Sequence, residues 1–285
     1  MLRHRLFFGT LMTICFTGLV VFDGWLDGSL TKSLSDDRPL QGTLLAALVA
    51  ILVVPAQFEF SKLAAAKGLS IFAPVSIPAS ILLATTWYWC QFVTVSQGLY
   101  VLFVLAFASV GVLLCQYIRH GTDGVMANCG ANCFSIVYLG LFSGFVLGIR
   151  IEFGLWPVLM SVFVVKSADI GAYAIGSLFG KRKFSPRISP AKTWEGMLAA
   201  IGVAILVAIA FAAIFDIMVW WLGLIFGFCF AVIGQAGDLV ESMMKRDARQ
   251  KDSASNVPGF GGVLDVIDSP LLALPFAYLF FRVFT

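Results

Sequence analysis

The chain has 285 residues, of which 60% are hydrophobic and only 12% charged, with a mean hydropathy of +0.94 and a formal net charge of +3. A soluble domain of this length does not carry so much apolar surface, so the composition excludes that class and indicates an integral membrane protein. The apolar runs are long and continuous rather than alternating, which favours membrane-spanning helices over a β-barrel.

Nine apolar segments, taken in chain order, are predicted to cross the membrane as helices. They cover about Leu6–Leu26, Leu40–Phe58, Leu69–Phe92, Tyr100–Tyr117, Cys133–Ile149, Phe153–Phe179, Met197–Phe215, Met218–Ala236 and Ser269–Phe284. The third and sixth contain prolines and polar residues, so we expect them to be kinked or broken. The first lacks a small-residue cleavage site, so we expect a retained helix rather than a signal peptide. The polar segment Gly121–Asn132 is expected to be a turn-rich loop.

The positions of lysine and arginine predict the orientation of these spans, because cytoplasmic loops are enriched in both residues. With the N-terminus in the cytoplasm, 14 of the 19 Lys and Arg residues fall on the cytoplasmic side, 4 fall outside, and Lys166 lies within a span. The sequence therefore predicts an all-α polytopic membrane protein with about nine transmembrane helices, a cytoplasmic N-terminus and a C-terminus outside.

Ionisable residues lie within or against the spans mainly after residue 150. We expect residues 1–150 to be N-terminal transmembrane helices that form a scaffold with dimer contacts. Residues 151–285 are expected to form a C-terminal catalytic region with cytoplasmic loops. In that region Lys166 and Asp169 share one helix face. They are either a mutually neutralising structural pair or part of a functional site, because ionisable groups at membrane depth are costly.

A basic loop follows the sixth span and ends in Ser-Pro-Ala-Lys-Thr-Trp-Glu-Gly at residues 189–196. At the mouth of a span, hydroxyl and ammonium groups can reach phosphate oxygens, and free backbone amides at a helix start attract anions. This segment therefore predicts phosphate binding. Simple helix capping by Ser189 or Thr193 is the alternative.

The densest charge in the chain lies between the last two spans. Asp238, Ser242 and Lys245 share one face of a helix, and Glu241 lies beside them. Asp265 and Asp268 share a face at the start of the last helix, and a glycine-rich turn can bring the two faces together. Carboxylates from separate helices are suitable ligands for Mg²⁺, which neutralises and orients a triphosphate. The neighbouring cations that can bind phosphates are Lys245, Arg246 and Lys251. Surface ion pairs, each stabilising by about 0–1 kcal/mol, are the alternative.

These segments resemble the phosphatidate cytidylyltransferase (CDP-diacylglycerol synthase) family over about residues 169–268. That family ends in a pattern close to Ser-x-x-Lys-Arg-x-x-x-x-Lys-Asp and, further on, Pro-x-His-Gly-Gly-x-x-Asp-Arg-x-Asp, and its upstream loop reads Ser-Pro-Lys-Lys-Thr-x-Glu-Gly. The matching residues are Ser189, Pro190, Lys192, Thr193, Glu195, Gly196, Ser242, Lys245, Arg246, Lys251, Asp252, Pro258, Gly261, Gly262, Asp265 and Asp268. The chain departs at three positions, where Ala191, Phe260 and Val266 stand in place of Lys, His and Arg. Two of these changes remove phosphate partners, so the lipid bound can differ while the carboxylates are kept.

The resemblance implies transfer of CMP from CTP to phosphatidate, which gives CDP-diacylglycerol and pyrophosphate in phospholipid biosynthesis. It implies catalytic roles for Asp238, Asp265, Asp268 and Lys245, with Asp238 and Asp265 as metal ligands. It implies substrate binding by Ser189, Lys192, Thr193, Glu195, Ser242, Arg246, Lys251 and Asp252. The expected cofactor is Mg²⁺, with a second, monovalent cation allowed. Expected partners are CTP, phosphatidate, membrane lipids and a second copy in a homodimer, and no nucleic acid. The expected location is a bacterial inner (plasma) membrane, with the active site facing the cytoplasm.

Two other functions stay open at this point. Ionisable residues within or beside interrupted spans are also typical of a membrane transporter, although an odd number of spans without repeats fits common transporter folds poorly. A CTP-dependent enzyme acting on another lipid phosphate or a polyprenol is the second alternative. Phe260 and Val266 also leave a nonenzymatic relative open.

Overall fold

The computed structural model is described here for residues 2–30, 40–250 and 261–285, and it is all-helical over these ranges. Its elements are α1 (Leu2–Leu26), α2 (Thr43–Ala65), α3 (Ala73–Ala84), α4 (Thr86–Trp89), α5 (Gln97–His120), α6 (Val125–Ser135), a π-helical segment (Ile136–Leu141), α7 (Phe142–Phe153), α8 (Leu155–Phe179), α9 (Trp194–Phe215), α10 (Trp220–Asp247) and α11 (Val263–Phe284). Within the described residues, eight helices are long and apolar enough to cross a membrane, counting α6, the π segment and α7 as one. The predicted all-α polytopic membrane class is therefore confirmed.

The third predicted span differs from a simple long helix. It consists of α3, only 12 residues long, followed by the single turn α4. The break falls at Thr85, whose hydroxyl donates to the Ile81 carbonyl at 2.7 Å. The sixth predicted span is unbroken after Gly154, as α8. The count of nine spans and the orientation of the two termini stay predictions.

The segment predicted as the loop Gly121–Asn132 is mostly helical, so that prediction was wrong. Only residues 121–124 form turns, and α6 begins at Val125 after Gly124, which has a φ of +65°. The asparagines that resembled loop residues face inward instead. Asn128 accepts a hydrogen bond from the Ser70 backbone N–H at 2.9 Å, and Asn132 accepts one from Phe72 N–H at 2.7 Å. Tertiary partners thus satisfy the side chains that usually favour turns.

Small residues allow the helices of the C-terminal half to pack closely. A buried stripe of alanines at every fourth position of α9 lies against α8 and α10, namely Ala200, Ala204, Ala208 and Ala212. On α10, a Cβ added at Gly227 would lie 2.5 Å from the Cα of Ile205, so only glycine permits this approach. Close backbone contact between small residues is the usual way in which membrane helices associate.

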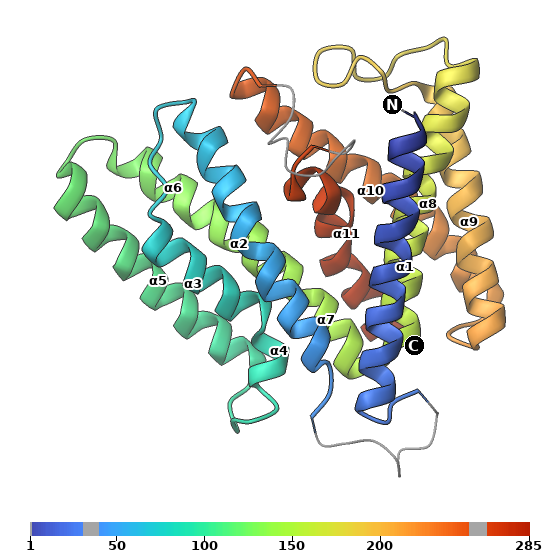
Figure 1. Cartoon of the computed structure of the whole chain (residues 1–285), viewed down its shortest axis with the longest axis horizontal. Coiled ribbons are helices and arrows are strands. Elements are labelled where there is room, and N and C mark those ends of the chain that lie inside the picture. Colours follow the sequence, from blue (N-terminus) through green and yellow to red (C-terminus); the bar gives the residue numbers. More distant parts are fainter. Residues whose placement is uncertain (1, 31–39, 251–260) are drawn as a thin grey trace.

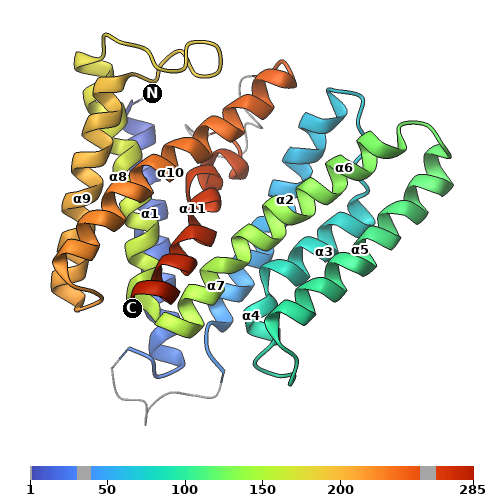
Figure 2. The same cartoon turned by 180° about the vertical axis from the view of Figure 1, so that it is seen from behind.

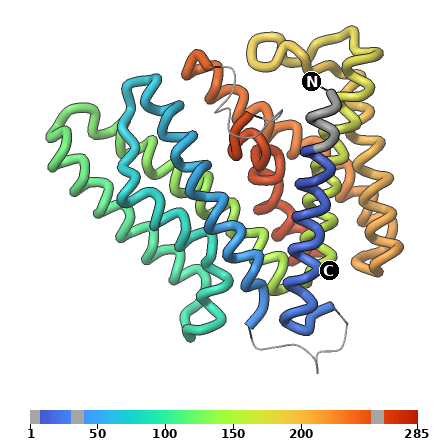
Figure 3. Tube along the Cα trace, in the orientation of Figure 1, coloured from blue at the N-terminus to red at the C-terminus, as the bar shows by residue number. Residues whose placement is uncertain are grey.

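The helix ends gather at two opposite ends of the molecule (Figures 1 and 2). The loop between α8 and α9 and the C-terminal ends of α2 and α10 lie at one end, and the chain's N-terminus lies there too. An ion pair of 2.8 Å between Lys67, just after α2, and Asp247 of α10 joins two of these segments. The C-terminus and the C-terminal end of α1 lie toward the other end, as the tube in Figure 3 also shows. Basic segments of the chain thus lie at one end of the molecule.

A buried ion-pair network joins the C-terminal ends of α1 and α7, far from the basic loops. The fully buried Arg150 donates from Nε to Asp23 Oδ2 at 3.2 Å and from Nη2 to Asp27 Oδ2 at 2.7 Å. Burial acts to raise the pKa of Asp27, but the hydrogen bond from Ser29 and the charge of Arg150 outweigh it and hold the pKa below its ordinary value of 3.8. The network therefore anchors α1 to the helical core.

Candidate active site

Lys192 is placed by the loop between α8 and α9, at the end of the molecule where the basic segments gather. Its Nζ lies 2.8 Å from Asp238 Oδ2 and donates to the backbone and side-chain oxygens of Gln235 at 3.0 and 2.9 Å. Gln235 in turn donates from Nε2 to Asp169 Oδ1 at 3.0 Å. The loop, α10 and α8 are thus joined around one group of polar side chains. Sequence reasoning missed Gln235, although a buried amide within an apolar span is itself a signal.

Three carboxylates from two helices converge beside Lys192. Asp238 and Glu241 of α10 and Asp268 of α11 each offer an oxygen within 4.8 Å of the others. Glycine permits this convergence, because a Cβ at Gly237 would lie 2.8 Å from the Asp268 carbonyl oxygen. Lys166 adds a cation, with Nζ 3.7 Å from Asp268 Oδ1 and 3.5 Å from Asp169. The predicted shared face of Lys166 and Asp169 is confirmed, and the pair belongs to this cluster.

The donor set of this cluster fits a divalent cation. Carboxylates this close repel one another unless a proton or cation neutralises them. Glu241 is fully buried, and its Oε1 has no hydrogen-bond partner in the part of the chain that the structure describes. Hard oxygen ligands of this kind suit Mg²⁺, which keeps part of its hydration shell and binds phosphates.

Asp265, predicted as a metal ligand, contacts Lys245 and the start of α11. Its Oδ1 lies 2.6 Å from Lys245 Nζ, and its Oδ2 accepts a hydrogen bond from Gly262 N–H at 2.7 Å, which closes the first turn of α11. Lys245 also pairs with Glu241. Within the described ranges, the three-carboxylate group contains Glu241 and Asp268 rather than Asp265 as companions of Asp238. Metal binding by Asp265 stays a prediction.

Glu59 of α2 fixes the start of the last helix. Its carboxylate accepts hydrogen bonds from Val263 N–H at 3.0 Å and from Leu264 N–H at 2.8 Å, and the side chain is 1% exposed. A carboxylate at a helix N-terminus satisfies amides that lack intrahelical partners and interacts favourably with the helix dipole. Sequence analysis placed no site residue in the first half of the chain. A carboxylate at the end of an apolar span was the available signal.

The remaining predicted residues mostly shape the loop. Thr193 caps α9 by accepting from Gly196 N–H at 3.2 Å, which is the alternative left open from the sequence. Glu195 accepts from the backbone N–H groups of Lys181 and Arg182, at 3.1 to 3.3 Å.

One further contact attaches the loop to α10, and another lies within the loop itself. Arg246 donates to the Ile188 carbonyl at 3.3 Å, and Ser189 accepts from Lys192 N–H through its carbonyl at 3.2 Å. Ser242 donates to Asp238 Oδ1 at 3.4 Å, so it belongs to the carboxylate cluster. At the departures from the family pattern, Ala191 is exposed and Val266 is half-buried. Lys251, Asp252 and Phe260 lie outside the described residues.

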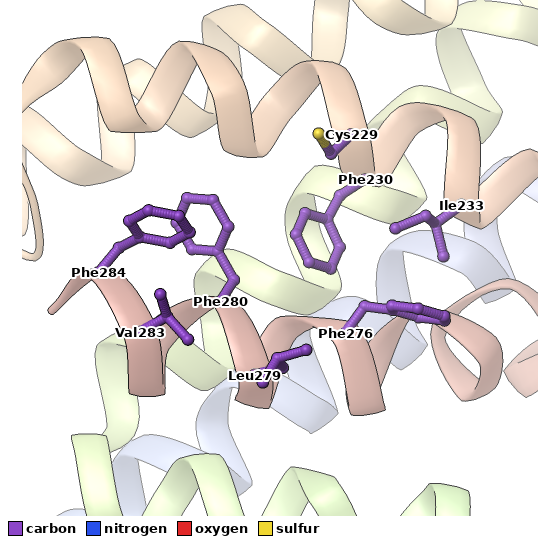
Figure 4. Close-up of a pocket in the computed structure, with 8 residues that line it drawn as sticks. All are labelled: Cys229, Phe230, Ile233, Phe276, Leu279, Phe280, Val283 and Phe284. Carbon is purple, nitrogen blue, oxygen red and sulfur yellow. The ribbon is translucent and has the colours of Figure 1, made fainter.

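An apolar groove lies between the same two helices, away from the carboxylates (Figure 4). It is lined by Cys229, Phe230, Ile233, Phe276, Leu279, Phe280, Val283 and Phe284. None of these side chains carries a charge, so the groove cannot bind phosphates. The groove is therefore separate from the carboxylate cluster of α10 and α11.

An all-helical membrane protein with buried carboxylates and lysines at one end of its helices has the groups that phosphoryl- and nucleotidyl-transfer enzymes use. A model of the Cytidylyltransferase family matches residues 39–284, and the chain belongs to that family.

Three relatives carry the name phosphatidate cytidylyltransferase. The Bacillus subtilis (strain 168) protein is 32% identical over 267 residues, which cover 87% of this chain and 98% of the relative. The Synechocystis protein is 28% identical over 271 residues, 85% of this chain and 89% of the relative. The Haemophilus influenzae protein is 41% identical over 136 residues, 46% and 47% of the two chains. The family predicted from residues 169–268 is thus confirmed over most of the chain.

Proposed function

We propose that this protein transfers the cytidylyl group of CTP to phosphatidate, giving CDP-diacylglycerol and pyrophosphate in phospholipid biosynthesis. The observation that carries the proposal is the cluster of Asp238, Glu241 and Asp268, faced by Lys192 and Lys166, in a chain of this family. The printed names of the relatives support the choice of substrates.

The reaction requires little covalent chemistry from the protein. An oxygen of the phosphatidate phosphate attacks the α-phosphorus of CTP, and the bond from that phosphorus to the bridging oxygen of the β-phosphate breaks, so that pyrophosphate leaves with the electron pair. The attacking phosphate is already an anion at neutral pH, so no strong base is needed. Catalysis then consists mainly of positioning and charge neutralisation.

The described residues divide these tasks between them. Asp238, Glu241 and Asp268 would hold Mg²⁺, which when bound supplies charge neutralisation and aligns the triphosphate. Lys192 and Lys166 would bind phosphate oxygens on either side of the carboxylates.

Lys245 would hold Glu241 in place through its buried ion pair and would connect Asp265 to the site, where Asp265 is retained as a catalytic residue and metal ligand on the family pattern. Arg246 and Glu195 would keep the shape of the loop that carries Lys192. Ser189 and Thr193 would support substrate binding through this loop, and Ser242 through Asp238. Lys251 and Asp252 are retained as substrate-binding residues on the family pattern alone.

We further propose a site on the cytoplasmic side of a bacterial inner (plasma) membrane. The loop rich in Lys and Arg carries Lys192, which pairs with Asp238, and such loops are typically cytoplasmic. Residues 1–150 would act as a scaffold and residues 151–285 would carry most of the catalytic groups. A homodimer and a second, monovalent cation are supported by the family resemblance.

Product formation by the purified protein in detergent tests the function. CTP, phosphatidate and Mg²⁺ are supplied together and then omitted one at a time, while CDP-diacylglycerol in the lipid extract and pyrophosphate in the aqueous phase are measured. The proposal requires both products only with all three components. If folded protein forms neither product from phosphatidate but uses another lipid phosphate, the acceptor is wrong, an outcome consistent with the two lost cations at Ala191 and Val266.

A further inference from the structure

Tyr138 lies in the single π-helical segment found within the described residues. The π-helical residues Ile136–Leu141 interrupt an otherwise continuous helix from Val125 to Phe153. The irregular register is fixed on one side by Gly140, where an added Cβ would lie 2.7 Å from the Cα of Ser80 in α3. Single π-helical turns inside α-helices are uncommon and are frequently found at functional sites.

The hydroxyl of Tyr138 is buried without a hydrogen bond. The side chain is 2% exposed, and Oη finds no partner among residues 2–30, 40–250 and 261–285. Buried tyrosine hydroxyls usually have a partner, because an unsatisfied polar group costs stability. Tyr278 shows the ordinary case, since its hydroxyl donates to Glu152 at 2.8 to 2.9 Å.

Aromatic packing holds the Tyr138 ring in place. It stacks on Phe134, with centroids 5.4 Å apart, and meets Phe142 edge-on at 5.9 Å. The same apolar cluster includes Leu264 and Leu271 of α11, with Val240 of α10 packed against it. Phenylalanine would satisfy all of these contacts, so packing does not explain the hydroxyl.

The apolar cluster that holds the ring adjoins the carboxylate cluster. Val240 directly precedes Glu241, and Leu264 and Leu271 flank Asp268 on α11. The phenol interacts electrostatically with both Asp268 and Glu241, although it hydrogen-bonds to neither. Tyr138 therefore presents an unused donor at the edge of the site that binds the substrates in the proposed function.

We propose that Tyr138 is a substrate-binding residue, whose hydroxyl donates a hydrogen bond to an oxygen atom held by Asp238, Glu241 and Asp268. That oxygen belongs either to the phosphate of phosphatidate or to a water molecule on Mg²⁺. The inference rests on the proposed function, and it explains both the orphaned hydroxyl and the π-helical register that places it there.

The test compares Tyr138→Phe with the matched control Tyr278→Phe. Without ligands, Tyr138→Phe is expected to melt at the same temperature as the wild type or higher, because it removes an unsatisfied group. Its KM for phosphatidate, or its half-saturating Mg²⁺ concentration, is expected to rise about 5- to 10-fold, as for one lost hydrogen bond. Tyr278→Phe is expected to melt lower and to keep both constants.

Melting shifts separate the two sources of the oxygen and do not require turnover. If Mg²⁺ alone raises the melting temperature of Tyr138→Phe less than that of the wild type, the hydrogen bond is assigned to a water on the cation. If phosphatidate, but not Mg²⁺, raises the melting temperature of the variant less than that of the wild type, the hydrogen bond is assigned to the lipid phosphate. Unchanged shifts together with unchanged kinetic constants would overturn the proposal. If the wild type makes no CDP-diacylglycerol, the proposed reaction fails, while the melting shifts still decide the role of Tyr138.

Discussion

Replacing Glu59 with Gln tests whether the start of α11 is positioned from α2. Both carboxylate oxygens accept backbone hydrogen bonds, from Val263 and Leu264, in a buried setting. The amide keeps one acceptor and turns an NH₂ group toward the other backbone N–H. The variant thus loses one charge-assisted hydrogen bond, which contributes about 1.5–3 kcal/mol, and a favourable helix-dipole interaction of about 0.3–1 kcal/mol.

The same change should reduce catalysis, because α11 carries Asp265 and Asp268 within its first turns. A displacement near 1 Å can cost on the order of 100-fold in rate, so we expect kcat of Glu59→Gln to fall by about 10- to 100-fold, with a smaller change in the KM for CTP. Thermal unfolding in detergent and steady-state kinetics measure the two effects.

Glu152→Gln is the matched control for this variant. Glu152 also accepts hydrogen bonds, from Trp87 at 2.8 Å and from Tyr278, in a partly buried setting near the end of α7, at the other end of the molecule. It should lower the melting temperature and leave kcat unchanged. Equal effects of both variants on kcat, or a Glu59→Gln protein with wild-type kcat, would refute the positioning argument.

The remaining predictions concern two other charged sites. Lys192→Met leaves Asp238 without its cation and should raise the KM for CTP by about 10- to 100-fold in steady-state assays; an unchanged KM would remove Lys192 from the phosphate site. Arg150→Met leaves two buried carboxylates unpaired and should destabilise the fold by about 3–5 kcal/mol in thermal unfolding, without changing kcat of the folded fraction. Because the pKa of Asp27 lies below its ordinary value of 3.8, its contribution to stability is complete at neutral pH and is lost as the pH falls through the lowered pKa. In the Asp27→Asn variant, the melting temperature should fall less steeply as the pH is lowered into the acid range. An unchanged slope of melting temperature against pH would contradict the ion pair between Asp27 and Arg150.

The sequence predicted the spans well because hydrophobic run length is a one-dimensional property. Eight of the nine predicted segments correspond to long helices, and the break in the third at Thr85 was expected from its composition. The loop predicted over Gly121–Asn132 was wrong because Asn128 and Asn132 bond to the chain before α3, a tertiary effect that local propensity does not contain.

The candidate site was only partly predictable for the same physical reason. Motif spacing identified Lys192, Asp238 and Asp268, since each lies in a segment of unusual charge. Spacing alone did not show which carboxylates meet, because that depends on how α10 crosses α11 at Gly237. Glu59 contacts the start of α11, and Tyr138 packs in the adjoining apolar cluster, both from segments distant in sequence. No local pattern could therefore connect them with the site.

The most direct test of the central claim follows the phosphorus atoms of CTP. Purified protein is incubated with phosphatidate, Mg²⁺ and CTP carrying label either at the α- or at the γ-phosphorus, and the label in the lipid extract is measured. The account predicts that only α-label enters the lipid, as CDP-diacylglycerol, while γ-label leaves in pyrophosphate. Transfer of γ-label to a lipid would contradict it and would indicate a CTP-dependent kinase.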